Sequence, residues 1–235
     1  MLDFDYDQYD LAGNIRNITD VGGGERGRTY AYDVLHRLTG AQLVAPGGGV
    51  AEQIDYDYDP VGNRLTRDVG GALETYDYDV FSNRLDSVTE GVEVRTLGYS
   101  ASGNTESDDR GAAADRMFVY DSSDRLIQVD EGAATLATYA HNAMGQRVAK
   151  TVGGATTHYV YDLSGRLVAE ADGATGAATA EYVWLEDMPL AFLHGGAIYY
   201  VHSDHLGTPQ RLTDGSKAVV WDASYTPFGA DTVSG

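Results

Sequence analysis

The chain has 235 residues, no cysteine and a formal charge of −20, with two lysines beside fourteen arginines. This acidity disfavours nucleic acid and anionic membrane surfaces as partners, because phosphate binding is driven by cationic surface. The lack of cysteine excludes disulfides and thiolate zinc sites. No apolar run approaches the ~20 residues of a membrane-spanning helix, and the N-terminal MLDFDYDQYD lacks the basic-then-apolar pattern of a signal peptide.

In chain order, the predicted elements are eleven β-hairpins and no helix. Seventeen tyrosines and 29 glycines favour strands and turns, and one phrase recurs at about 21 residues from end to end. We call the residue before each turn the anchor. The anchors are Tyr9, Tyr32, Tyr58, Tyr78, Tyr99, Tyr120, His141, Tyr161, Tyr182, Ser203 and Tyr225.

The stretch DYDYDPVGNRLTRD at residues 55–68 shows the logic of one unit. Tyr56 and Tyr58 are two apart, so both rings lie on one face of a strand and the aspartates between them point to the other. Asp59-Pro60-Val61-Gly62 has the preferences of a type I turn. The aspartate accepts from the backbone two residues on, and the glycine takes the left-handed conformation of a bulged return.

The return strands place arginine before an apolar residue at what the alignment predicts to be a single repeat position. There the guanidinium would stack on tyrosines of a neighbouring strand or pair with their aspartates. Glycine-rich stretches at 22–24, 47–49, 70–71 and 153–154 predict the opposite turns. The seven arginines are Arg37, Arg64, Arg84, Arg125, Arg147, Arg166 and Arg211.

The phrase Tyr-Asp-x-x-Gly-Asn-Arg-Leu at this period resembles the YD repeat of the RHS (rearrangement hotspot) family, whose relatives include the C components of insecticidal toxin complexes and the teneurin shell. The segment YVHSDHLGTPQRLTDGSKAVVWDASYTPFG at residues 200–229 resembles the opening of the RHS-associated core. The resemblance implies an all-β fold in which tandem hairpins form a long, spiralling antiparallel sheet. It divides the chain into hairpin repeats at 1–199 and a truncated core at 200–235.

The resemblance also implies a non-catalytic shell segment that encloses or presents a C-terminal toxin of a protein secreted by, or displayed on, a bacterium. Its partners would be the rest of the shell and the enclosed toxin, and edge-to-edge self-association is a further expectation. The self-cleavage motif and toxin that usually follow the Pro-Phe-Gly motif are not in this sequence. We therefore expect a piece of a larger protein and carry over neither activity.

Other chemistries compete with this reading. His202, Asp204 and His205, with His194 nearby, are candidate metal ligands, but Asp204 is also the expected turn cap. Aspartates at 3–7 and 55–59 suggest calcium, without the spacing of an EF-hand. Ser203-Asp204-His205 is sequential, unlike a catalytic triad. Trp184 and Trp221 would serve the alternative function, a carbohydrate- or cell-surface-binding module, if exposed, although packing is the simpler role.

We therefore expect neither cofactor, metal nor catalytic residue, and assign the recurring residues a structural role. This repeat set is Tyr9, Asp10, Gly13, Tyr58, Asp59, Gly62, Arg64, Tyr78, Asp79, Arg84, Tyr161, Asp162, Gly165, Arg166, Asp204, Gly207, Arg211, Tyr225, Pro227 and Gly229.

Overall fold

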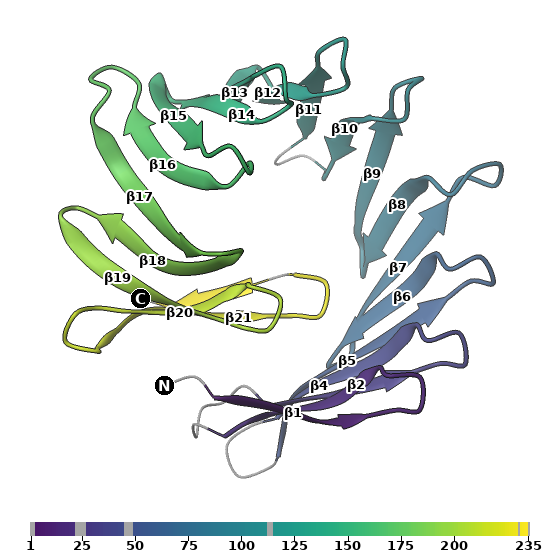
Figure 1. Cartoon of the computed structure of the whole chain (residues 1–235). Helices are drawn as coiled ribbons and strands as arrows, with labels where there is room; N and C mark the ends of the chain where they lie inside the picture. The colour runs from purple at the N-terminus through teal and green to yellow at the C-terminus, as the bar shows by residue number, and fades with distance from the viewer. Residues whose placement is uncertain (1–2, 22–26, 45–48, 112–114, 230, 235) are drawn as a thin grey trace. The chain divides into compact units, whose positions relative to one another are not determined.

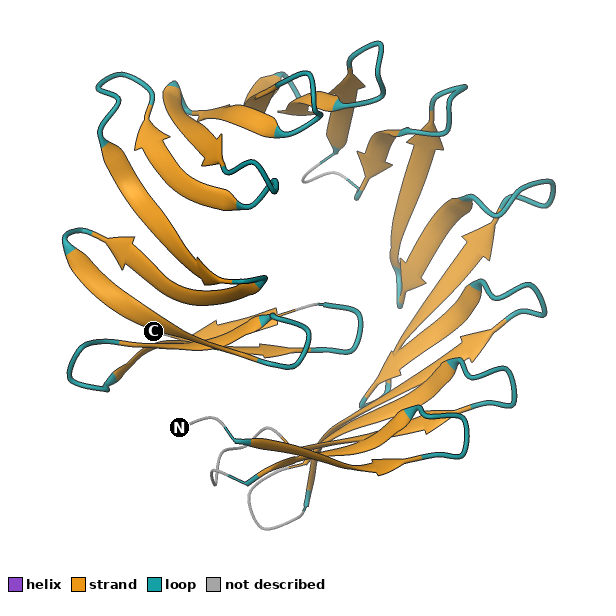
Figure 2. Ribbon diagram, in the orientation of Figure 1, coloured by secondary structure: helices purple, strands orange, loops and turns teal. Residues whose placement is uncertain are grey.

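The computed structural model describes residues 3–21, 27–44, 49–111, 115–229 and 231–234. These residues contain 22 strands and no helix (Figure 2). Two compact units, Met1–Leu97 and Gly98–Gly235, divide the chain, with the boundary inside the ninth strand. The expected all-β class is confirmed, and no helix in the described residues could span a bilayer.

The first unit holds the purple-to-blue strands of Figure 1. They are β1 (Phe4–Tyr9), β2 (Ile15–Asp20), β3 (Gly27–Tyr32), β4 (Leu38–Val44), β5 (Val50–Tyr58), β6 (Arg64–Val69), β7 (Ala72–Tyr78), β8 (Leu85–Glu90) and β9 (Glu93–Tyr99).

The second unit continues in teal, green and yellow in the same figure. Its strands are β10 (Thr105–Asp109), β11 (Arg116–Tyr120), β12 (Leu126–Glu131), β13 (Ala134–His141), β14 (Arg147–Val152), β15 (Ala155–Tyr161), β16 (Leu167–Asp172), β17 (Ala178–Leu185), β18 (Met188–His194), β19 (Ala197–Ser203), β20 (Pro209–Thr213), β21 (Val219–Tyr225) and β22 (Asp231–Ser234).

Within each unit every strand pairs antiparallel with the next strand in sequence. The β5–β6 hairpin is representative: Ile54 pairs with Val69 and Asp57 with Thr66, and a bulge then shifts the register so that Tyr58 faces Arg64. The same shift falls directly before the anchor in β3, β7, β11, β13, β15 and β19. A bulge increases local twist and re-aims the residue that follows it, so each anchor side chain is turned relative to the strand before it.

The opposite turns that the structure describes are tight where glycine pairs predict them. Gly70 and Gly71 both have positive φ, 58° and 97°, between the paired residues Val69 and Ala72. Gly153–Gly154 repeats the pattern. Positive φ at both central residues defines a type I′ turn, whose twist matches a hairpin. The predicted turn at 22–24 and most of that at 47–49 lie outside the described residues.

The core of each unit is thin. Its buried apolar side chains are Ile18, Ala41, Ile54, Tyr56 and Tyr76 in the first unit, and Val129, Ala137, Ala180, Ala191 and Ala223 in the second. In the first unit, Tyr56 and Tyr76 are buried while Asp55, Asp57 and Asp77 on the other face are exposed, as the alternation predicts. Because so few side chains are buried, stability must come largely from contacts between adjacent hairpins.

Candidate functional site

The repeated turn is the chain's most regular chemical feature. Asp59 Oδ1 accepts hydrogen bonds from the backbone N–H groups of Val61 (3.0 Å), Gly62 (2.7 Å) and Asn63 (2.8 Å), and its Oδ2 accepts from the Asn63 amide (2.9 Å). One carboxylate thus satisfies the donors of a turn that would otherwise be left to water. Equivalent bonds are made by Asp10, Asp33, Asp121, Asp162, Asp204 and Asp214, and by the amide oxygen of Asn142.

These bonds also hold the turn carboxylates in their charged form. In Asp33, Asp121 and Asp162, a hydrogen bond from the backbone N–H of the arginine four residues on is the largest cause that lowers the carboxyl pKa. Hydrogen bonds to the charged form of a carboxyl favour that form. The lowered pKa of these aspartates therefore reflects their structural role in the turn. The carboxylates of the turn aspartates are therefore engaged in hydrogen bonds from the backbone and are poorly placed to act as acids or bases.

The fourth turn position has the left-handed backbone that the turn requires. Gly62 has φ of 102° and Gly13 has φ of 89°, and a Cβ added at either would meet no atom within 4 Å. Most copies use glycine here, but His36 (φ 62°), Asp124 (57°) and Lys217 (69°) take the same conformation. The constraint is thus conformational and does not come from lack of space.

Gly62→Val is expected to destabilise the first unit by about 1–2 kcal/mol, since a β-branched side chain resists positive φ. Gly62→Asn should cost less, because asparagine tolerates this region. Gly215→Val is the matched control, since Gly215 sits in an open turn without a left-handed φ. Denaturant unfolding followed by hydrogen exchange measures the effect, in β5 and β6 for Gly62 and in β20 and β21 for Gly215. Equal costs at the two glycines would contradict the turn assignment.

Six of the predicted anchors, all tyrosines, fasten their hairpin to the preceding one, whereas the anchors His141 and Ser203 make no such bond. Tyr58 donates its hydroxyl proton to the carbonyl of Leu38 at 2.7 Å, and Tyr78 to that of Arg64 at 3.0 Å. Tyr32, Tyr120, Tyr161 and Tyr225 make the same bond to Ile15, Thr105, Arg147 and Pro209. The acceptor in each case lies just after the previous turn. The anchor ring therefore spans from one hairpin to the next and fixes their spacing.

The anchor predicted at Tyr182 is wrong. The bulge of that hairpin lies between Val183 and Trp184, and it is the Trp184 indole N–H that donates to the carbonyl of Leu167, at 2.8 Å. Tyr182 instead donates to Glu170 at 2.8 Å. Counting a constant spacing missed this shift because tryptophan was treated as a packing residue and not as a tyrosine equivalent.

The prediction of one arginine position is also wrong, because the arginines occupy different registers. Arg37, Arg125 and Arg166 follow the turn aspartate by four residues and pair with it through Nε at 2.7, 2.9 and 2.8 Å. Their Nη1 atoms donate to the first carbonyl of the next turn, at Asp59, Asn142 and Glu186. Each such arginine bridges two adjacent turns.

The second arginine position lies one residue further on and stacks on tyrosines. The Arg64 guanidinium lies 4.4 Å from the ring centre of Tyr76 and 5.8 Å from that of Tyr56. Arg147 repeats this with Tyr159 (4.5 Å) and Tyr139 (5.8 Å). Asn63 and Gln146 then hold the turn in place of the bridging arginine. Arg211 differs again and pairs with Asp222 at 2.8 Å.

A partly buried polar cluster next to Arg64 was not predicted. Glu74 accepts from Arg67 Nη1 at 2.9 Å and from the Tyr76 hydroxyl, which also accepts from Arg64 Nη2 at 2.9 Å. The cross-strand pairing of Arg67 with Glu74 brings these charges together. Opposite charges on consecutive strands are the signal that could have found it.

The candidate metal ligands are engaged elsewhere. His202 Nε2 lies 2.9 Å from the Thr213 hydroxyl, and Asp204 caps its turn and accepts from Gln210 at 3.1 Å. His194 Nδ1 lies 2.9 Å from the Thr179 carbonyl. Among the residues that the structure describes, no three His, Asp or Glu side chains gather as a metal would need. The geometry suits a repeating scaffold better than a chemical centre.

Comparisons with known proteins show which family profiles match this chain. The RHS Repeat family profile matches residues 9–50, and the RHS protein profile matches residues 198–234. These two segments of the chain carry RHS sequence. The predicted resemblance is thereby confirmed, and the second match falls on the segment that resembles the RHS-associated core. The domain division at residue 199 stays a prediction.

Two curated relatives are similar over most of this chain. The double-stranded DNA deaminase toxin A of Burkholderia cenocepacia strain H111 is 25% identical over 88% of the chain. The tRNA3(Ser)-specific nuclease WapA of Bacillus spizizenii is 24% identical over 76% of it. The chain spans only 17% and 8% of the lengths of these two relatives.

Solved structures with similar strands include a Photorhabdus luminescens Tc holotoxin pore, at 16% identity and a TM-score of 0.45, with 97% of this chain and 15% of that one covered. The crystal structure of TcdB2-TccC3 gives 16% identity and a TM-score of 0.45, with 95% and 16% covered.

Proposed function

We propose that this RHS chain is a non-catalytic wall segment of a β-shell that encloses or presents a C-terminal toxin of a secreted or surface-displayed bacterial protein. The observation that carries the proposal is the repeated fastening between hairpins: anchor hydroxyl to the previous hairpin, bridging arginine to the next turn. Because neighbouring hairpins are joined by the same bonds, a sheet can be extended hairpin by hairpin, as a shell wall requires. The remaining repeats of the shell and the enclosed toxin would be its partners.

The two curated relatives support a role that is independent of any one activity. One is named for deamination of double-stranded DNA and the other for cleavage of a tRNA, yet each resembles most of this chain. A segment shared by proteins with different chemistry is better explained as a common scaffold than as the source of either activity. The occupied turn carboxylates fit that role, because they stabilise the backbone.

Small-angle scattering on the purified chain tests the wall. A solid globule of this length has a radius of gyration near ~17–18 Å. We expect a clearly larger value together with the scattering profile of a folded protein, because a wall segment buries few side chains. A radius of gyration at the globular expectation would contradict the proposed wall segment and favour a binding module. A glycan array, with Trp184→Ala and Trp221→Ala as controls, is the direct measurement of such binding.

Enclosure of a guest is the finer part of the proposal and needs its own measurement. A disordered peptide fused after Gly235 should be cut more slowly by a protease than the same peptide fused to an unrelated carrier. A Gly62→Val chain, with one hairpin weakened, should protect it less. Equal cutting rates in all three fusions would contradict enclosure of a guest and would leave only a structural role for the sheet.

A further inference from the structure

Two turns of the second unit contain an aspartate followed directly by glycine. Asp172-Gly173 lies at the end of β16, and Asp214-Gly215 lies directly after β20. In such a pair the backbone nitrogen of the second residue can attack the side-chain carboxyl carbon of the first and close a five-membered succinimide ring. Glycine favours this attack because it has no side chain to crowd its nitrogen and because its backbone adopts many conformations.

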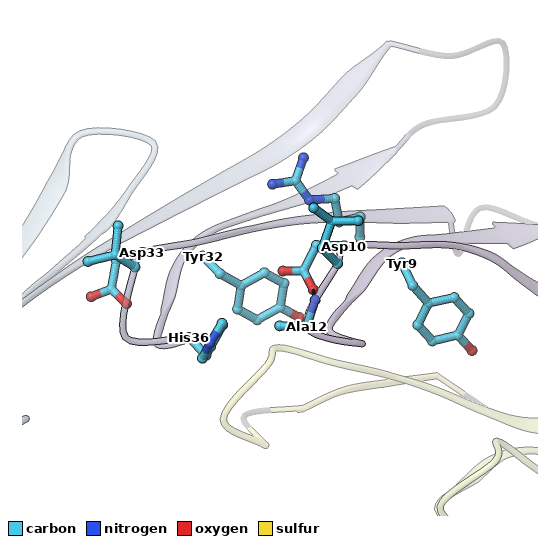
Figure 3. A pocket seen from close by; sticks show the side chains of 9 residues that line it. Tyr9, Asp10, Ala12, Tyr32, Asp33 and His36 are labelled. Carbon is cyan, nitrogen blue, oxygen red and sulfur yellow. Dashed lines mark hydrogen bonds between the residues drawn. The ribbon is translucent and has the colours of Figure 1, made fainter.

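Other turn aspartates precede larger residues. Asp10 is followed by Leu11 and Asp33 by Val34, and all four residues line one depression at the first two turns (Figure 3). A side chain on the residue after the aspartate crowds the backbone nitrogen that would attack, most strongly where that residue is β-branched. The two Asp-Gly turns are therefore the places in this sequence where ring closure is least hindered.

The two carboxylates have matching surroundings. Asp172 Oδ1 accepts from two backbone N–H groups, at 3.2 and 2.8 Å, and from the Thr175 hydroxyl at 2.7 Å. Asp214 Oδ1 accepts from two backbone N–H groups, at 2.8 and 2.9 Å, and from the Ser216 hydroxyl at 2.7 Å. In both, the hydroxyl bond is the largest cause that lowers the carboxyl pKa. The carboxyl groups alone therefore predict similar reactivity at the two sites.

The two glycines differ. The Gly173 N–H donates to the Thr156 carbonyl at 2.8 Å, and a Cβ added at Gly173 would lie only 2.7 Å from the Thr156 Cβ. Gly215 is exposed, its N–H has no partner among the described residues, and a Cβ there would meet no atom within 4 Å. The Gly173 nitrogen must break a hydrogen bond before it can attack, whereas the Gly215 nitrogen has none to break.

We propose that Asp214-Gly215 is a site of spontaneous isoaspartate formation and that the fold protects Asp172-Gly173 from the same reaction. The Gly215 nitrogen bonds to Asp214 Cγ, the Cγ–Oδ2 bond breaks, and the carboxyl hydroxyl leaves as water with the amide proton. The three donors on Oδ1 stabilise the negative charge that develops on that oxygen during the attack. Water then opens the ring at the former main-chain carbonyl, so the product has the mass of the starting chain.

The product lacks the cap of this turn. The main chain of an isoaspartate runs through Cγ and is longer by one methylene, so the carboxylate that accepts from Ser216 and Ala218 is lost from its place. This turn joins β20 to β21, inside the segment that the RHS protein profile matches. We expect the modification to weaken that hairpin, because a turn aspartate satisfies backbone donors.

Peptide mapping of the aged chain tests the site. The folded chain is incubated at mildly acidic pH, where more of each carboxyl is protonated, and isoaspartate is located by electron-transfer fragmentation. It is expected at Asp214 at a rate at least about tenfold above that at Asp172, the factor that one net backbone hydrogen bond supplies. A Gly215→Ala chain, whose open turn has room for the methyl group, should react several-fold more slowly at Asp214.

Unfolding the chain in denaturant is the matched control, since both sites should then react at similar rates. Equal accumulation at the two sites of the folded chain, or none at Asp214, would overturn the proposal. So would a preference for Asp214 that persists in denaturant, because local sequence and not the fold would then select the site. Hydrogen exchange of β20 and β21 should be faster in the aged chain, and unchanged exchange there would contradict the loss of the turn cap.

Discussion

Tyr76→Ala is expected to destabilise the first unit by about 3–5 kcal/mol, the usual cost of deleting a buried aromatic ring. Tyr76 is only 8% exposed in a sheet with few other buried side chains. Its ring also supports the Arg64 guanidinium at 4.4 Å, and its hydroxyl joins Arg64 to Glu74. Removing the ring therefore leaves a cavity and two charged groups without a shared partner.

Hydrogen exchange of β5 to β8 under denaturant measures this loss directly. Both tryptophans lie in the second unit, so their fluorescence serves as an internal control that should change little. Tyr9→Ala is the matched substitution, because Tyr9 is 54% exposed and should cost much less. Similar losses at the two tyrosines would show that Tyr76 is not a centre of stability.

Tyr76→Phe separates the hydroxyl from the ring and carries a pH signature. Burial first, and then the hydrogen bond to Glu74, raise the pKa of Tyr76 to about 12. The folded state thus holds this proton more tightly than the unfolded state, where tyrosine titrates near 10. The contribution is complete below pH 10 and is lost as the pH rises from 10 to about 12. The Phe variant should therefore lose less stability than the wild type over that interval.

Much of the hairpin architecture could be predicted because it depends on interactions between residues that are close in sequence. Asp59-Pro60-Val61-Gly62 specifies its turn through one carboxylate and one left-handed residue, and Tyr56 and Tyr58 specify a face by spacing alone. Both rules act within a few residues, so a single sequence is enough to read them. The same holds for the glycine pairs at 70–71 and 153–154.

The contacts between hairpins could not be read in the same way. An arginine four residues after its aspartate, like Arg37, pairs with that carboxylate and also lies 4.9 Å from the Tyr58 ring centre, whereas one five residues after it, like Arg64, contacts two tyrosine rings. Alignment on the Arg-Leu phrase hid that difference, since side-chain direction in a strand reverses with each residue. Trp184 likewise replaces a tyrosine only because a bulge re-aims it.

Arg110→Ala is expected to destabilise the second unit by about 2–4 kcal/mol. Asp108 is 2% exposed, and its Oδ2 accepts from Arg110 Nε at 2.9 Å and Nη2 at 2.7 Å. Breaking a buried pair leaves an uncompensated charge, at about 3–5 kcal/mol; the value here is reduced because the Arg110 side chain is 40% exposed.

The ion pair of Arg110 with Asp108 matters more for stability because it lies at a short ladder between two strands. Only two residue pairs join β10 to β11, Ser107 with Met117 and Asp108 with Arg116, the shortest described ladder of the second unit. A double-mutant cycle with Asp108→Ala should give a coupling energy of at least about 1 kcal/mol, since the double variant leaves no lone charge. Additive losses would mean that Asp108 is held by its other contacts, and that the Arg110 pair is not what secures this part of the sheet.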